Sequence, residues 1–291
     1  MSKFNVKVDN SIIASPMNYI GGKAKILPQI RPYFPKDIDN FYDVFAGGAN
    51  VSVNIEAENI FINDLNYYVI DILKYFYLTD IDSILDCIYF YIQKYNLSKT
   101  NKEGFFNLRN DYNEKKNPIM LYTLICYSFN YQFRFNNSQE YNNTFGNERS
   151  HFSKRLESKL IRFVAKLKER SIFFSCKSFN NFLEYQDFTK DSFVYLDPPY
   201  LITTGSYNDG NRGFKNWNLL QERLLLDSLK KLDRQGVRFA LSNVLTHKGK
   251  ENSLLIEFAK NYKVVEINQN YSNSSYNTTK GDSTEILLIN Y

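Results

Sequence analysis

One short stretch of the chain combines residue types that can act on a planar amino group. Residues 193–196 form an apolar run that we predict to be a buried strand, and Asp197, Pro198, Pro199 and Tyr200 follow it directly. Neither proline has an N–H for a strand ladder, so the chain must leave the sheet in a stiff, extended turn. The Asp197 carboxylate, the turn carbonyls and the Tyr200 ring then project beyond the strand's carboxyl end, where α/β sheets bind ligands.

This turn suits a ring that carries an NH2 group. A carboxylate and a backbone carbonyl can accept the two hydrogen bonds of the amino group, and the aromatic side chain can stack on the ring. The alternative is an ordinary turn between a strand and a loop. The rest of the sequence has to decide between these two interpretations.

Glycine pairs precede this stretch at two places. The Gly-Gly-Lys sequence at residues 21–23 stands at a predicted helix start, and without a full phosphate-loop pattern it is weak evidence by itself. The stretch 41–50 predicts a strand, a glycine turn and a helix that continues to residue 55. Gly47 and Gly48 would let a ligand approach backbone N–H groups directly.

An acid at the end of the next strand completes a nucleoside-binding pattern. The predicted strand 60–62 ends at Asp64, which lies 17 residues beyond Gly47. Nucleotide-binding α/β folds hold ribose hydroxyls with an acid at about this spacing. Phe179, after a third predicted strand, could edge an adenine pocket. A plain strand–helix–strand turn is the alternative.

The pattern along the chain is that of an α/β fold interrupted by a helical segment. Residues from 66 to about 170 have helical periodicity, with helices expected over 119–129 and from Ser153 onward. Further elements are expected as strands at 172–174, 237–241, 264–267 and 286–289, a helix at 217–234, and loops at 201–216 and 268–282.

The helical segment carries the positive charge of the chain. The net charge is +5, and residues 97–170 hold 14 Lys and Arg against 7 Asp and Glu, whereas the remainder is slightly acidic. Such a distribution favours contact with a polyanion through this segment, and a solvated helix face is the alternative.

Alternating aromatic residues within this segment predict a hairpin at residues 130–146, with a polar tip. Arg134 stands between Phe133 and Phe135, where it could reach a guanine edge or a phosphate. Alternatively, the two phenylalanines anchor the hairpin to the core and leave Arg134 in solvent.

Cysteine and histidine usage gives no sign of a metal site. Three scattered cysteines (Cys87, Cys126 and Cys176) and two histidines have no zinc spacing, and they suggest a reducing compartment. No window approaches the length of a membrane span, and residues 1–15 do not resemble a signal peptide. We therefore expect a cytoplasmic protein without a metal ion.

Taken together, the sequence resembles the Dam-type (alpha-class) N6-adenine DNA methyltransferases of bacteria and phages. The resemblance covers nearly the whole chain, and the order of its motifs is also the family's. These motifs are Tyr-Ile-Gly-Gly-Lys at 19–23, Phe-Ala-Gly-Gly at 45–48, Asn-Asp at 63–64, Arg-Phe-Asn at 134–136, Phe-Gly at 145–146, Asp-Pro-Pro-Tyr at 197–200 and Leu-Ser-Asn at 241–243.

The resemblance implies a role for each matched residue. Residues that bind S-adenosylmethionine would be Tyr19, Lys23, Phe45, Gly47, Gly48, Asp64, Phe179 and Asp197. Residues 197–200 would hold a flipped adenine. DNA contacts would come from Phe129, Asn130, Gln132, Arg134, Asn136 and Thr144. Gln132 stands where GATC-reading relatives have an apolar residue, and Thr144 stands where they have proline. The implied target is GATC or, because of these two differences, a related site.

The resemblance also implies an architecture and partners. A Rossmann-like methyltransferase sheet with helices on both faces would comprise residues 1–65 and 171–291. Residues 66–170 would be an inserted helical target-recognition domain with a β-hairpin. Double-stranded DNA would be the substrate, and any cognate restriction endonuclease would act as a separate protein. The rival activities are N4-cytosine methylation, protein glutamine methylation and DNA binding without catalysis.

Overall fold

The computed structural model describes residues 12–203, 217–267 and 283–291. Within these ranges eight strands form one sheet in the order β3-β2-β1-β4-β5-β8-β7, with β6 beside β5. The strands from β3 to β5 in this order are parallel, and β8 is antiparallel to both of its neighbours. The strands are β1 (Asn40–Asp43), β2 (Asn59–Asn63), β3 (Ser171–Ser175), β4 (Phe193–Leu196), β5 (Arg238–His247), β6 (Lys250–Glu251), β7 (Lys263–Ile267) and β8 (Ser283–Ile289). The strands that were expected in the main sheet are therefore confirmed.

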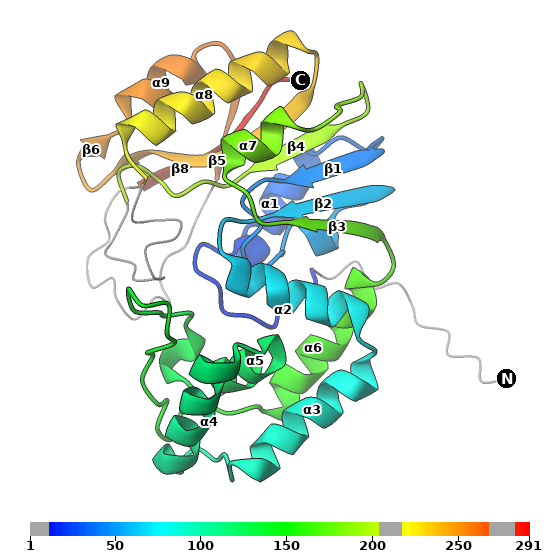
Figure 1. The fold of residues 1–291 in the computed structure, drawn as a ribbon. Helices are drawn as coiled ribbons and strands as arrows, with labels where there is room; N and C mark the ends of the chain where they lie inside the picture. The colour runs from blue at the N-terminus through cyan, green and yellow to red at the C-terminus, as the bar shows by residue number, and fades with distance from the viewer. Residues whose placement is uncertain (1–11, 204–216, 268–282) are drawn as a thin grey trace, which may run out of the picture.

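Helices cover both faces of this sheet. Successive residues of a strand point to opposite faces, so Phe41 enters one hydrophobic cluster and Tyr42 the other. The Tyr42 face is covered by α7 (Phe179–Glu184), α8 (Leu219–Arg234) and α9 (Ser253–Ala259), and Figure 1 shows α8 and α9 side by side above the sheet. Leu27 and Ile30 of α1 (Leu27–Ile30) pack on the Phe41 face. The expected doubly covered, Rossmann-like sheet is confirmed.

Five longer helices lie between β2 and β3. They are α2 (Tyr67–Leu78), α3 (Ile81–Lys94), α4 (Lys102–Lys115), α5 (Pro118–Cys126) and α6 (Lys154–Leu167). Each begins after a side chain that accepts a backbone N–H of the first turn, namely Asn66, Asp80, Asn101, Asn117 and Ser153. Such caps satisfy N–H groups that have no partner within the helix, so the sequence fixes where each helix starts.

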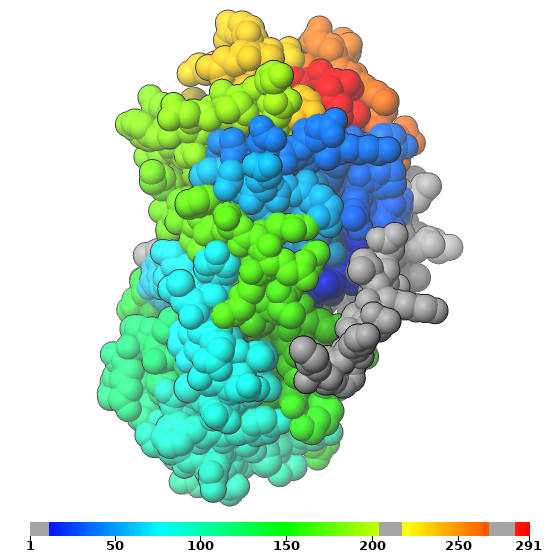
Figure 2. Space-filling model, turned by 90° about the vertical axis from the view of Figure 1, so that its right-hand side faces the viewer, coloured from blue at the N-terminus to red at the C-terminus, as the bar shows by residue number. Residues whose placement is uncertain are grey.

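The helical segment shares one continuous core with the sheet. Leu73 of α2 and Leu160 of α6 belong to the same buried cluster as Ile60 of β2. Figure 2 shows the cyan and green helical segment below and, above it, the blue, yellow and orange parts of the sheet and of the helices that cover it, in contact without a break. The helices therefore stand in a fixed position relative to the strands that carry the acidic residues.

The prediction of a helix over residues 50–55 is wrong. Only a short 3-10 turn, η3 (Ser52–Asn54), forms there. The Asn54 side chain instead bonds to both backbone groups of Ile13, and Asn50 Oδ1 accepts the Ser15 N–H. Because these asparagines hold an upstream segment of backbone, they compete with a regular helix.

The expected hairpin is an irregular loop with two isolated antiparallel bridges, Ser128 to Phe145 and Phe135 to Tyr141. Asn130 and Tyr131 both have left-handed backbone angles, with φ of 54° and 55°, and this interrupts a regular ladder. The Asn143 side chain donates to the Phe129 and Gln132 carbonyls in place of strand pairing.

Three other element expectations change. The strand expected at 237–241 continues to His247 because its second half pairs with β8. Helices α7 and α9 were not expected. The helix expected over 119–129 ends at Cys126, three residues early. The expected loops at 204–216 and 268–282 lie outside the described residues. In the ranges that the structure describes, no helix is both long and apolar enough to cross a bilayer.

Candidate active site

Three parallel strands bring three acidic side chains to one edge of the sheet. Asp43 ends β1, Asp64 follows β2 and Asp197 follows β4, and Asp43 is in register with Tyr195. Burial raises the pKa of Asp43 to about 7, and the charges of Asp197 and Asp64 add to this effect. The carboxyl ends of the strands thus form a buried acidic edge, as expected for Asp64 and Asp197.

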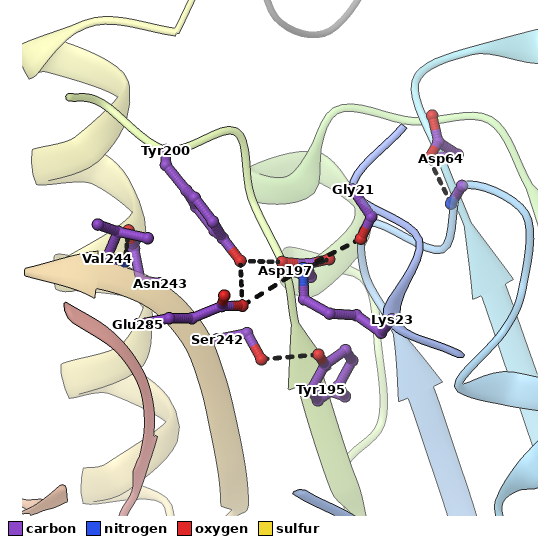
Figure 3. A network of polar contacts seen from close by, with 11 residues as sticks. Gly21, Lys23, Asp64, Tyr195, Asp197, Tyr200, Ser242, Asn243, Val244 and Glu285 are labelled. Carbon is purple, nitrogen blue, oxygen red and sulfur yellow. Dashed lines mark hydrogen bonds and ion pairs between the residues drawn. The ribbon is translucent and has the colours of Figure 1, made fainter. Parts of the chain in front are cut away.

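Asp197 begins the turn at residues 197–200, here called the acceptor turn, and is held by two donors, Lys23 and Tyr200 (Figure 3). Lys23 Nζ lies 2.7 Å from Asp197 Oδ2 and donates to the Gly21 carbonyl at 3.1 Å. The Tyr200 hydroxyl donates to Asp197 Oδ1 at 3.0 Å, and Lys23 Nζ lies 5.2 Å from the centre of the Tyr200 ring. Lys23, Asp197 and Tyr200, expected from separate motifs, are therefore brought together.

Burial and charge act in opposite directions on Asp197. Burial raises the pKa of its carboxyl above the ordinary value, and the Lys23 ammonium and the Tyr200 hydroxyl oppose this rise. The neighbouring Pro198 and Pro199 are buried, so the acid sits on a rigid support. An ionised Asp197 is an acceptor with two oxygens that faces the end of β4.

Asp64 fixes the glycine turn as well as ending its own strand. Its Oδ2 accepts the Gly47 N–H and its Oδ1 accepts the Asn66 N–H, both at 2.8 Å. Burial raises the pKa of Asp64 to about 6, although the N–H groups of Asn66, Gly47 and Leu65 lower it. The carboxylate therefore couples the turn after β1 to the start of α2.

Close packing against neighbouring side chains requires glycine at positions 47 and 48, which is a reason other than ligand access to backbone N–H groups. A Cβ on Gly47 would meet the Tyr19 ring at 2.7 Å, and one on Gly48 would meet Ser15 Oγ at 3.0 Å. Gly47 also has a φ of 49°, and its N–H is taken by Asp64. The space left by the missing side chains is filled by Tyr19 and Ser15.

Aromatic rings line the neighbouring edge of the sheet. The ring centres of Phe45, Phe179 and Trp217 lie 5.6–5.7 Å from one another. Phe45 is partly exposed, whereas Phe179 and Trp217 are buried. Trp217 Nε1 donates to the buried Glu222 at 2.8 Å, which holds the indole in place.

The loop at 130–146 touches the segment that precedes Lys23. Asn18 Nδ2 donates to the Asn130 carbonyl at 2.8 Å, and the rings of Tyr19 and Phe133 meet edge to face at 5.5 Å. Tyr19 therefore lies between the glycine turn and this loop.

The residues expected to contact DNA differ in their freedom. Arg134 is exposed between the buried Phe133 and Phe135, so the two rings anchor the loop to the core, as the alternative to a base-reading Arg134 supposed. Phe129 and Thr144 are also exposed, and the Thr144 carbonyl accepts the Phe129 N–H.

Other members of the expected DNA set hold the loop together. The Asn136 side chain bonds to the backbone N–H and the carboxylate of Glu140, so it closes the tip of the loop. The Gln132 carbonyl accepts the Tyr141 hydroxyl, and the Gln132 side chain is partly exposed. These geometries leave the base-reading roles as predictions.

A family model matches residues 19–273, and its description is a D12 class N6 adenine-specific DNA methyltransferase. The match includes the acceptor turn, the glycine turn and the helical segment. The chain belongs to this family.

Several curated methyltransferases are similar to this chain. Type II methyltransferase M.FokI of Planomicrobium okeanokoites is 55% identical over 97% of the chain and 43% of its own length. Modification methylase StsI of Streptococcus sanguinis is 47% identical over 99% of the chain and 44% of its own length. The chain thus spans less than half the length of these two relatives. A DNA adenine methylase of Haemophilus influenzae is 26% identical over 75% of each chain, so the Dam-type enzymes are more distant relatives.

The acidic edge fits S-adenosylmethionine, the methyl donor that this methyltransferase family implies. Asp43 Oδ1 is buried without a hydrogen-bond partner, and neither Asp43 nor Asp64 has an ion pair among the described residues. A ligand that carries a sulfonium charge and ribose hydroxyls supplies the positive charge and the donors that such an edge lacks. Within the ranges described, no group of three His, Cys, Asp or Glu side chains is arranged to hold a metal ion.

The sequence analysis of this D12-class chain missed three residues of the site. Asp43 could have been found, because an acid that ends a buried strand beside a glycine turn faces the ligand edge. Trp217 and Glu285 had no local signal. Glu285 stands on β8, beyond the last residue that the family model matches, and its carboxylate lies 3.3 Å from the Tyr200 hydroxyl.

Proposed function

We propose that this chain transfers a methyl group from S-adenosylmethionine to N6 of a flipped adenine in double-stranded DNA. The observation that carries this proposal is the partly buried, ion-paired Asp197 at the end of β4, within an Asp-Pro-Pro-Tyr turn. Membership of the D12 class supports the choice of adenine N6 as the acceptor.

The acceptor turn acts on the amino group of the target base. The N6 lone pair of adenine is delocalised into the ring, which makes the nitrogen a poor nucleophile. Hydrogen bonds from N6–H to Asp197 and to the Pro198 carbonyl favour a nitrogen rehybridised toward sp3, whose lone pair is exposed. Positioning and charge are then the main contributions of the protein.

Tyr200 compensates for taking the base out of the helix. Flipping costs a few kcal/mol, and stacking of the base on the Tyr200 ring returns roughly 1–3 kcal/mol. The cation–π contact with Lys23 holds the ring near the acid before the base arrives.

S-adenosylmethionine supplies an electrophilic methyl group on a sulfonium when it is bound. Asp64 would hold its ribose and Phe45 and Phe179 would border its adenine, while Tyr19, Lys23 and the glycine turn complete the pocket. The acidic edge described above stabilises a cationic ligand by Coulombic attraction. This supports the residue set expected from the family motifs.

Residues 66–170 would form the target-recognition domain of this enzyme. The segment carries the excess positive charge, and its loop at 130–146 presents Arg134 to solvent beside the Asn18–Tyr19 segment. Arg134 would read a guanine edge, and Gln132 would pair with an adenine. The Dam-type resemblance suggests a target of GATC or a related sequence, and Gln132 and Thr144 are the positions that would alter it.

The experiment that tests this function is incubation with labelled S-adenosylmethionine and unmethylated DNA, followed by nucleoside analysis. We expect label in N6-methyladenine. Label in N4-methylcytosine would identify the rival amino-methyltransferase. Tight DNA binding with no labelled nucleoside would identify a binding module, against which the ion-paired Asp197 argues.

A cognate restriction endonuclease is a further proposal. Two relatives are named as a type II methyltransferase and a modification methylase. The endonuclease would cleave the sequence that this chain protects, as a separate protein.

A further inference from the structure

A second buried carboxylate stands beside Asp197 in the acceptor site. Glu285 is 2% exposed and projects from β8, where it is in register with Val244 of β5 and Ile267 of β7. The register of β5 shifts between Val244 and Thr246, so an irregularity of the sheet lies at this position. A buried carboxylate is costly unless a donor or a cation compensates it, so its partners matter.

Two partners of Glu285 are the same groups that hold Asp197. Its Oε1 lies 3.3 Å from the Tyr200 hydroxyl and 4.0 Å from Lys23 Nζ. Figure 3 shows dashed contacts from the Tyr200 hydroxyl and from the Lys23 ammonium to both carboxylates; Asp197 follows β4 and Glu285 stands on β8. The acceptor site therefore contains two acids that share one hydroxyl and one ammonium.

Each oxygen of Asp197 already has one donor in this arrangement, and a second donor to Oδ1 would have to share that oxygen with the Tyr200 hydroxyl. Lys23 engages Oδ2, and the Tyr200 hydroxyl engages Oδ1. The amino group of a target base needs one of these oxygens as its acceptor. Since Lys23 makes the shorter contact, at 2.7 Å against 3.0 Å, the hydroxyl is the donor that can leave more easily.

The Tyr200 hydroxyl has one proton and two acid acceptors within reach. Burial raises the pKa of the Tyr200 phenol well above its ordinary value, and the charges of Asp197 and Glu285 raise it further. The phenol therefore stays protonated and can donate to one carboxylate at a time. A small rotation moves the donation from 3.0 Å on Asp197 to 3.3 Å on Glu285.

We propose that Glu285 is a positioning residue, which accepts the Tyr200 hydroxyl when the amino group of the target base binds to Asp197. Glu285 thereby frees Asp197 Oδ1 and fixes the Tyr200 ring for stacking. This inference rests on the proposed function, because it needs an amino group as the acceptor of the methyl group.

The test is a cycle of variants at Glu285 and Tyr200, assayed as single-turnover methylation of an oligonucleotide that wild type methylates. Glu285→Ala should lower the rate about 10- to 100-fold, as expected for loss of a hydrogen bond to a charged group. Glu285→Gln should recover most of the rate, because its carbonyl oxygen still accepts the hydroxyl.

The second arm uses the variant that lacks the hydroxyl. In a Tyr200→Phe background, Glu285→Ala should change the rate within about 2-fold only, because no hydroxyl competes for Asp197. An equal loss from Glu285→Ala in both backgrounds would overturn the inference, and so would a Glu285→Gln variant as slow as Glu285→Ala.

Matched controls separate this role from damage to β8. Thr284→Val removes the neighbouring side-chain contact with Thr246 and should keep the wild-type rate. Thermal unfolding and calorimetric binding of S-adenosylmethionine establish that each variant is folded. A wild type that methylates no adenine overturns the proposed function and this inference with it. An active wild type with additive variants overturns the inference alone.

Discussion

Single carboxylates of the acidic edge differ in what compensates their burial. Asp197 is paired with Lys23, whereas Asp64 is held by backbone N–H groups and Asp43 by one hydroxyl, that of Ser52 at 2.6 Å. Burial raises the pKa of Asp43 to about 7 and that of Asp64, which has more backbone donors, to about 6, so Asp43 holds a proton more tightly than Asp64. The three aspartates of the acidic edge are therefore not equivalent, although they are the same residue type.

Asp64→Ala should weaken binding of S-adenosylmethionine by at least about 10-fold, since hydrogen bonds to charged groups contribute roughly 1.5–3 kcal/mol. Isothermal calorimetry measures this change. Asp64→Asn, which keeps one oxygen for the Gly47 N–H, should bind the cofactor better than Asp64→Ala. The salt dependence of DNA binding should not change in either variant. An unchanged cofactor affinity would remove Asp64 from the site.

Asp43 should make the free protein less stable as the pH rises. Its folded-state pKa of about 7 exceeds the ordinary 3.8, so the folded protein holds a proton that the unfolded chain has lost between these values. The contribution to stability is therefore full below about pH 4 and is lost as the pH passes 7, with an upper limit of about 4 kcal/mol.

Denaturant unfolding between pH 4.5 and 8 tests this expectation. The isosteric Asp43→Asn variant should lose less stability across this range than wild type does, with a residual slope from Asp64. Parallel profiles for the two proteins would show that Asp43 is already ionised in the folded state.

At the scale of elements, two loops meet where recognition and chemistry have to be coordinated. The Asn18–Tyr19 segment contacts the glycine turn on one side and the loop at 130–146 on the other. The buried Phe133 and Phe135 fix the loop backbone, which leaves Arg134 as the exposed side chain between them. Such an arrangement holds the backbone of Arg134 at a defined place relative to Lys23.

Arg134→Ala should cost roughly 1–3 kcal/mol of binding at the true site and relax the preference at one base pair. Gln132→Leu should shift the preference at a neighbouring position. The exposed Arg155 of α6 offers a control, since Arg155→Ala should weaken binding to all sequences alike and reduce the salt slope by about one.

Methylation of a randomised oligonucleotide pool, read by sequencing, measures these preferences for wild type and the three variants. Identical site preferences in wild type and both loop variants would mean that the loop is a structural anchor. The base-reading surface would then lie elsewhere.

At the scale of the whole molecule, the elements and site residues that the sequence predicted best are those that depend on neighbours in sequence. The strand at 193–196, its Asp-Pro-Pro-Tyr turn and Asp64 were found because a buried strand followed by polar residues is a local pattern. The irregular turn at 50–55 was not, because distant residues such as Ile13 satisfy its asparagines.

Long-range pairing explains the residues that sequence reasoning missed. Glu285 lies 85 residues after Tyr200 in the chain. It reaches Tyr200 only because β8 inserts between β5 and β7. The sequence gives its charge and its strand, but the order of strands decides which site it enters. Trp217 likewise joins Phe45 only through the packing of α8 on the sheet.

The central claim is that the Asp197 carboxylate accepts the amino group of adenine during methyl transfer. The most direct measurement compares wild type with Asp197→Ala for DNA binding, thermal unfolding and label in N6-methyladenine from S-adenosylmethionine. Asp191→Ala, at the opposite end of β4, is the control and should keep wild-type activity. We expect Asp197→Ala to stay folded and to bind DNA, but to form no detectable N6-methyladenine. A folded Asp197→Ala protein that still methylates adenine at more than a trace of the wild-type rate would contradict the account.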